Sequence, residues 1–149
     1  MITLRDITPE NYEQCLNLTV HDNQKNFVAS NVRSLADAWL FYKTAKPFAI
    51  YNNDEMVGFL MLDLDSDNDG TGKIFLWRFM IDRNFQKLGY GNAALELAIK
   101  YVQNNFNVDR MRTSYEPNNN VVGKLYKKFG FAETGEVLYG ETVVELKFT

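Results

Sequence analysis

Hydrophobic and polar residues recur along the chain with two different spacings, one typical of strands and one typical of helices. Seven segments either alternate apolar and polar residues or stay apolar over a strand's length, and turn residues bound them. Asn52-Asn53-Asp54 separates two of these segments and Tyr139-Gly140 separates two others, so we expect a hairpin at each place. The predicted strands are residues 2–7, 47–51, 56–64, 73–81, 108–114, 131–137 and 142–148.

Helical signals mark four further segments. Thr8-Pro9-Glu10 supplies an N-cap, a proline at the first helical position and an acidic first turn. Ser34 and Asn119 are cap candidates for two later helices, and Gly130 is a stop signal for the last one. The predicted helices are residues 9–18, 35–45, 91–104 and 120–129, and the third carries an apolar stripe at Leu95, Ala98, Ile99 and Val102.

The order of these elements, β-α-α-β-β-β-α-β-α-β-β, predicts the fold class. It favours an α/β fold with a central mixed, mostly antiparallel sheet flanked by helices. Residues 21–31 are polar and are expected to form a loop or a short helix. No internal repeat or low-complexity linker divides the chain, so we expect residues 1–149 to form a single domain.

Composition narrows the classes of function. The net charge of −3 argues against a nucleic-acid partner and favours a cationic substrate. No apolar run approaches a membrane span, and the first residues do not resemble a signal peptide. Cys15 is the single cysteine, and no Cys/His cluster has zinc-ligand spacing. We therefore expect a cytoplasmic protein with no metal and no membrane partner.

The segment Phe79 to Asn92 carries the clearest chemical signal. A strand runs into a loop with Gly89 and Gly91, which opens a helix, and such a loop presents free N–H groups to a diphosphate. One interpretation is a dinucleotide fingerprint, with Asp109 holding a ribose, but seven residues separate the strand from its first glycine. A second interpretation is a plain turn before a helix.

A third interpretation is a family resemblance. Gln86-x-x-Gly89-x-Gly91 is similar to the [Q/R]-x-x-G-x-[G/A] signature of the GNAT acetyltransferases. The block from Asn119 through Tyr126 to Phe131 resembles that family's N-x-x-A-x-x-[L/F]-Y-x-x-x-G-F. Within the family, the run Arg78 to Asp82 and the hairpin residues Gly140-Glu141 look like those of bacterial spermine/spermidine acetyltransferases.

The resemblance implies acetyl-CoA as co-substrate and assigns residues to it. Backbone groups of the strand at Phe79 and Ile81 would hold the pantetheine arm, the loop amides the diphosphate, and a lysine such as Lys87, Lys127 or Lys128 a phosphate. Asn119 would bond the arm, cap its helix, or do both. The expected cofactor-binding residues are Phe79, Met80, Ile81, Gln86, Lys87, Leu88, Gly89, Tyr90, Gly91, Asn92, Asn119 and Lys128.

The resemblance also implies a mechanism: direct attack of a small cationic amine, a polyamine above all, in a ternary complex. Tyr126 would be the general acid for the leaving thiolate, and the Ile81 N–H would stabilise the oxyanion. Animal relatives carry a glutamate where Trp77 stands, so Glu116 is the remaining candidate base. A homodimer is also implied. Other acceptors (an aminoglycoside, an amino acid or a protein amine) and a non-catalytic acetyl-CoA-binding module stay open.

Two remaining patterns have simpler interpretations. Asp65 to Gly70 matches the first half of a calcium loop, but Leu76 stands at the twelfth position, so we expect a hairpin turn with an acidic tip. Phe27, Trp39 and Tyr42 lie in a region that forms a wall of the acceptor cleft in this family. Their rings would suit a cation there, although we expect Trp39 to pack in the core.

Overall fold

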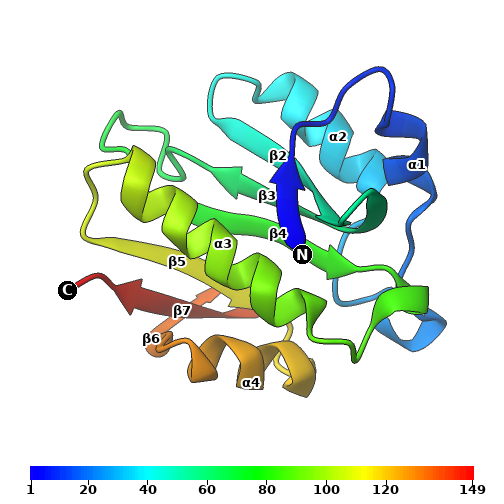
Figure 1. Cartoon of the computed structure of the whole chain (residues 1–149). Coiled ribbons are helices and arrows are strands. Elements are labelled where there is room, and N and C mark those ends of the chain that lie inside the picture. The colour runs from blue at the N-terminus through cyan, green and yellow to red at the C-terminus, as the bar shows by residue number, and fades with distance from the viewer.

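The computed structural model covers residues 1–149 and has the predicted order of strands and helices (Figure 1). Two 3-10 turns, Asp22–Gln24 and Arg83–Phe85, lie between them. The elements are β1 (Ile2–Arg5), α1 (Tyr12–Asn17), α2 (Asn31–Leu40), β2 (Ala45–Asn52), β3 (Glu55–Asp63), β4 (Phe75–Ile81), α3 (Tyr90–Asn105), β5 (Arg110–Tyr115), α4 (Asn120–Lys128), β6 (Ala132–Leu138) and β7 (Glu141–Lys147).

The seven strands form one sheet in the order β1-β2-β3-β4-β5-β7-β6. Every neighbouring pair is antiparallel except β4 and β5, which are parallel. This parallel pair follows from the chain path, because α3 carries the chain back across the sheet between β4 and β5. The expected mixed, mostly antiparallel sheet is confirmed.

Two buried clusters lie on opposite faces of this sheet. The larger one packs α3 and α4 against one face and includes Leu60, Leu95 and Tyr126. The smaller one packs α1 and α2 against the other face and includes Cys15, Phe59 and Met80. Because successive strand residues point to opposite faces, neighbouring residues such as Phe59 and Leu60 belong to different clusters. Figure 1 shows α3 crossing the sheet and α2 near its β2 end.

Two helix starts differ from the prediction. The first helix begins at Tyr12, because the Asn11 side chain accepts from the Thr8 N–H (2.8 Å) and closes a turn around Pro9. The second begins at Asn31, with Ser30 as its cap: the Ser30 Oγ accepts from the Arg33 N–H (3.1 Å). Ser34, the predicted cap, lies buried inside that helix.

The last predicted helix and hairpin agree with the structure. Asn119 caps α4, and Gly130 ends it in the left-handed region with φ 100°. Tyr139 and Gly140 both have positive φ, as a two-residue hairpin turn between β6 and β7 requires. No helix has the length and apolar character needed to cross a membrane.

Candidate functional site

A gap opens between the two parallel strands at the centre of the sheet. β4 and β5 pair only at Phe75–Arg112 and Leu76–Thr113. β4 then continues to Ile81 along β3, and β5 continues to Tyr115 along β7, so the two strands diverge toward their carboxyl ends. Beyond Leu76, the edge of β4 that turns toward β5 has no strand partner. Its backbone groups are therefore available to a ligand.

The backbone groups of Phe79 and Ile81 point into this gap. The Asp82 N–H donates to the Val57 carbonyl of β3 (2.8 Å), and backbone groups alternate between the two edges of a strand. Met80 shares the β3-directed edge with Asp82, and its side chain is buried against α1 and α2. Met80, one of the expected cofactor-binding residues, therefore turns its backbone groups toward β3 and not toward the gap.

The loop after β4 forms a concave set of unpaired donors. Every backbone N–H from Lys87 to Asn92 lacks a protein acceptor, since the first bond of the following helix runs from Ala93 N–H to the Gly89 carbonyl. Lys87 and Gly89 both have positive φ, 64° and 85°, which turns neighbouring N–H groups toward one side. The N-terminus of α3, a 16-residue helix, adds its partial positive charge at the same place. This arrangement suits a diphosphate.

Side chains hold the loop in this shape. The Gln86 Nε2 donates to the Ile81 carbonyl (3.0 Å) and to the Gln24 side chain (2.9 Å), and Gln24 donates back (3.1 Å). The buried Asp82 carboxylate accepts from the Thr19 N–H (2.8 Å). Gln86, expected to contact the cofactor, is thus bonded within the protein and joins the loop to the segment between α1 and α2.

The remaining loop residues offer backbone more than side chain. The Tyr90 hydroxyl accepts from the Asn52 side chain (3.0 Å), which ties the start of α3 to the end of β2. Leu88 is largely exposed. The Asn92 Oδ1 is buried without a hydrogen-bond partner. The N–H groups of these residues stay free, so an anion at this loop would meet main-chain donors.

Tyr126 lies beside the point where β4 and β5 separate. Its ring packs on Phe79 of β4 (centroids 6.5 Å apart) and on Tyr115 of β5 (5.9 Å). Thr113, whose hydroxyl donates to the Leu76 carbonyl (2.9 Å) at the last β4–β5 pair, neighbours the phenol. Burial raises the pKa of Tyr126 strongly; Thr113 partly offsets this rise, and the charge of Glu141 adds to it. The phenol stays protonated at any ordinary pH.

Asn119, Glu116 and Lys128 lie around the amino end and outer side of α4. The Asn119 side chain caps the helix by accepting from the Val122 N–H (3.5 Å), which leaves its Nδ2 free. Glu116 follows the last residue of β5, is half-buried and makes no side-chain hydrogen bond or ion pair. Lys128 is exposed and unpaired. The geometry allows the cap role of Asn119 and a ligand contact together.

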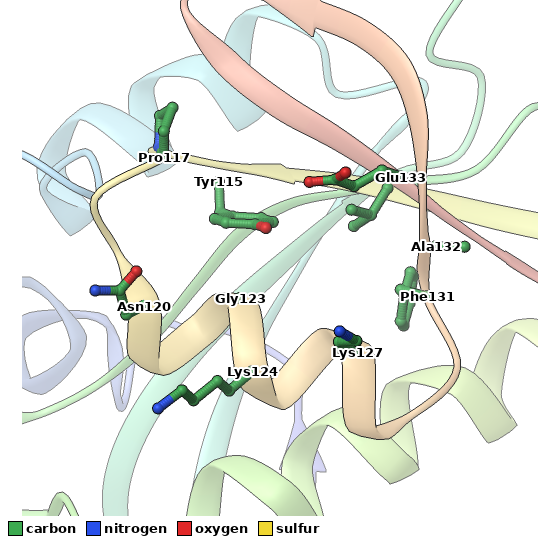
Figure 2. A pocket seen from close by; sticks show the side chains of 10 residues that line it. Tyr115, Pro117, Asn120, Gly123, Lys124, Lys127, Phe131, Ala132 and Glu133 are labelled. Atoms are coloured by element: carbon green, nitrogen blue, oxygen red, sulfur yellow. The ribbon is translucent and has the colours of Figure 1, made fainter.

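A cavity of about 470 Å³ lies between α4 and the strands β5 and β6 (Figure 2). Lys124 and Lys127 belong to its lining, and none of the loop residues Lys87 to Asn92 does. The Tyr115 ring covers Gly123 in this cavity so closely that a Cβ there would lie 2.9 Å from the Tyr115 Cε2. The cavity is therefore not the gap, but its Tyr115 wall is the ring that also supports Tyr126.

The α2 side of the gap carries an ion pair and exposed rings. Arg78 of β4 bonds Asp37 of α2 (3.0 Å), with side chains 14% and 11% exposed. The Arg78 guanidinium also lies over the ring of Trp77, the residue that bulges out of β4, at 4.8 Å. Phe41 contacts Trp77 edge-on at 6.1 Å. Trp39 is 79% exposed, so its expected place in the core was wrong.

One carboxylate near the gap was not among the predicted site residues. Glu141, the first residue of β7, accepts a hydrogen bond from the Ser114 hydroxyl of β5 (2.7 Å). In the sequence, Gly140-Glu141 stands out as part of a hairpin and of the family resemblance, neither of which gives Glu141 a place in the site. Its place beside Ser114 depends on the register of β7 on β5, for which the sequence holds no local signal.

In the acidic loop after β3, the carboxylates accept hydrogen bonds from other residues of the same loop. Asp65 accepts from the N–H groups of Gly70 (2.9 Å) and Gly72 (3.2 Å), and Asp69 accepts from Thr71 (3.0 Å). These bonds close turns, as the hairpin interpretation expects. No group of three or more His, Cys, Asp or Glu side chains is placed to hold a metal ion.

Comparison with known proteins assigns this geometry to a family. Residues 12–131 match the model of the acetyltransferase (GNAT) family. The spermine/spermidine N(1)-acetyltransferase of Bacillus subtilis (strain 168) is 33% identical over 150 residues, 96% of each chain. A Vibrio cholerae spermidine N-acetyltransferase, solved with CoA and spermine, shares the fold with a TM-score of 0.75 at 16% identity, over 97% of this chain and 92% of the other. An aminoglycoside acetyltransferase solved with coenzyme A reaches 0.81 at 14% identity, over 99% and 95%.

Proposed function

Because the chain belongs to the GNAT acetyltransferase family, we propose that this N-acetyltransferase moves the acetyl group of acetyl-CoA to a primary amine of a polyamine such as spermine or spermidine. The observation that carries the proposal is the unbroken run of unpaired N–H groups from Lys87 to Asn92 beside the β4–β5 gap. A diphosphate and an extended amide arm are the ligand parts that such a loop and such a strand edge recognise.

Acetyl-CoA would be held along this line of backbone groups. The loop amides take the diphosphate, and the gap-facing backbone groups of Phe79 and the N–H of Ile81 take the amides of the pantetheine arm, since Gln86 already bonds the Ile81 carbonyl. The Asn119 Nδ2 supplies one further donor, and Lys128 is a phosphate candidate on the outer side. The bound thioester supplies an activated acetyl group.

Tyr126 is the proposed donor to the leaving sulfur. A thiol has a pKa near 8.5 and an ordinary phenol near 10, so complete proton transfer from a phenol to a thiolate is uphill by about 2 kcal/mol or more. Burial raises the pKa of Tyr126 further and makes it a weaker acid. We therefore assign Tyr126 a hydrogen bond to the developing thiolate, and the attacking amine provides the proton that finally neutralises it.

Glu116 is the proposed route for the proton that the amine must lose before attack. An alkylammonium has a pKa of about 10, so at pH 8 roughly one molecule in a hundred is neutral at a given amine. Glu116 lies half-buried and unpaired after β5. A carboxylate there orients water, or accepts the proton directly, as the ammonium approaches.

A polyamine acceptor is supported by three observations. The 33% identical relative is named for spermine and spermidine. The net charge of −3 attracts a polycation. The rings of Trp77 and Phe41, together with the exposed Trp39 and Tyr42, offer π faces on the α2 side of the gap.

The test is a thiol-release assay with spermine, spermidine, putrescine, lysine and an aminoglycoside as separate acceptors. We expect release with spermine and spermidine far above the rate without an acceptor, and calorimetric binding of acetyl-CoA alone. Release with only the aminoglycoside or lysine would reject the polyamine. Binding without release for any amine would favour a non-catalytic acetyl-CoA-binding module.

A further inference from the structure

Glu141 occupies a defined place at the end of the β5–β7 ladder. Ser114 pairs with Val143 and Tyr115 with Thr142, so Ser114 and Glu141 share the face of the sheet that α2 also covers. The Ser114 Oγ donates to the Glu141 Oε1 at 2.7 Å, a short bond typical of a charged acceptor. Ser114 thus fixes the carboxylate beside the edge of the gap.

Glu141 differs from Glu145, Glu136 and Asp37 in lacking a cationic partner. Glu145, four residues along the same strand, binds Arg112 (2.7 Å) and Arg110 (3.3 Å). Glu136 binds Arg112 (3.3 Å), and Asp37 binds Arg78 and Arg33. The only side-chain partner of Glu141 is the neutral Ser114 hydroxyl.

The charge of Glu141 acts on titratable groups on both sides of the gap. It contributes to the raised pKa of Tyr126, whose ring is 97% buried on the α4 side. It also opposes, as a smaller effect, the lowering of the pKa of Arg78 that burial causes on the α2 side. Glu141 therefore lies within electrostatic range of the proposed sulfur donor.

We propose that Glu141 is a specificity-determining residue that binds the ammonium next to the reacting amine of the acceptor, and that Ser114 positions it. This inference rests on the proposed polyamine acetylation. A fixed carboxylate beside the gap attracts a second positive charge of the acceptor and gives a diamine an advantage over a monoamine. The reacting amine itself, which must lose its proton, lies at the Glu116 end.

The test compares spermidine with butylamine in wild type, Glu141→Gln and the control Glu145→Gln, which removes the same charge from the same strand. We expect Glu141→Gln to raise the KM for spermidine about 10- to 100-fold, with the KM for acetyl-CoA and the kcat/KM for butylamine within twofold. Glu145→Gln should keep most of the preference for spermidine. Equal losses in both variants, or an unchanged KM in Glu141→Gln, would overturn the proposal.

The role of Ser114 has its own control. Ser114→Ala should raise the KM for spermidine about three- to fivefold, and Ser114→Thr, which keeps the hydroxyl, should restore it. Calorimetric titration of spermidine into the acetyl-CoA-saturated proteins separates binding from chemistry. If wild type binds spermidine but does not acetylate it, and Glu141→Gln does not bind it, the proposed polyamine acetylation is rejected. The proposed role of Glu141 in binding the ammonium is then retained. If neither protein binds spermidine, both proposals fail.

Discussion

At the scale of single residues, Tyr126 packs in the core and also lies next to the gap. Its neighbours Phe79 and Tyr115 come from the two diverging strands, and burial keeps the phenol neutral by raising its pKa. A neutral hydroxyl in apolar surroundings is a directional donor that contributes little to stability, so its effect should appear in the rate and not in folding.

Tyr126→Phe should therefore lower kcat for spermidine by about 10²-fold and leave the KM for acetyl-CoA within twofold. The midpoint of thermal unfolding should change little, because the ring and its packing are kept. Steady-state kinetics and a melting curve on the same preparation check both parts. A variant with wild-type kcat would remove Tyr126 from the mechanism.

Gly123 influences the position of Tyr126 indirectly, through the ring of Tyr115. An added Cβ would lie 2.9 Å from the Tyr115 Cε2 and 3.2 Å from its hydroxyl, so Gly123→Ala must displace the ring that supports Tyr126. Alanine gains about 1 kcal/mol of helix propensity at the same time. We expect kcat to fall several-fold with little change in thermal stability. Val121→Ala, at an exposed position of the same helix, is the control and should keep kcat.

At the scale of elements, two substitutions in the loop between β4 and α3 distinguish main-chain from side-chain contributions to acetyl-CoA binding. Gly89 has φ 85° and open space around it, so Gly89→Ala costs about 1–2 kcal/mol through backbone strain alone. We expect this variant to bind acetyl-CoA about tenfold more weakly in calorimetry, because the strain turns the N–H groups away from their common side.

Lys87→Gly is the complementary change in the same loop. Lys87 already has φ 64°, which glycine adopts without strain. If the main chain holds the diphosphate, the affinity for acetyl-CoA should stay within threefold despite the lost charge. A tenfold loss would instead assign the phosphate to the lysine side chain.

The same elements show what the sequence could and could not predict. The order of strands and helices, the loop and the Asn119 cap follow from local periodicity and turn chemistry. The start of α2 does not, because Ser30 and Ser34 are equally good caps. Ser30 is the actual cap, and a long-range bond from the Asn31 Nδ2 to the Cys15 carbonyl (2.8 Å) holds the helix start. Glu141 was missed for a similar reason, since strand register brings it to Ser114.

At the scale of the whole molecule, two buried weak acids are expected to make the protein less stable at alkaline pH. Burial raises the pKa of Cys15 to about 11 and that of Tyr126 above its usual value. The folded state thus keeps protons that the unfolded chain releases. The stabilisation from these two groups is therefore fully present below about pH 9 and decreases as the pH rises toward 11. For Cys15, a rise of two pKa units corresponds to a loss of about 3 kcal/mol in the free energy of unfolding once the pH has passed through this range.

Cys15→Ser tests this pH dependence. The variant loses the titrating thiol, so its free energy of unfolding should decline less steeply between pH 9 and 11 than that of wild type. Urea unfolding at several pH values measures both slopes, and the offset between the two proteins at pH 8 accounts for the change in packing. Parallel curves would show that Cys15 does not contribute.

The family resemblance also leads us to expect a homodimer. Light scattering on the purified protein should give the mass of two chains across a tenfold range of concentration. A monomer mass at every concentration would contradict this expectation, and it would leave the residues of the proposed site unchanged, because all of them come from one chain.

The most direct test of the central proposal is to follow the acetyl group itself. Acetyl-CoA with a carbon-13-labelled acetyl group is mixed with the protein and spermidine, and the carbon spectrum is recorded over time. We predict that the thioester carbonyl signal disappears and that an amide carbonyl signal of acetylated spermidine replaces it, with no free acetate. A thioester that persists, or one that becomes acetate alone, would contradict acetyl transfer to a polyamine.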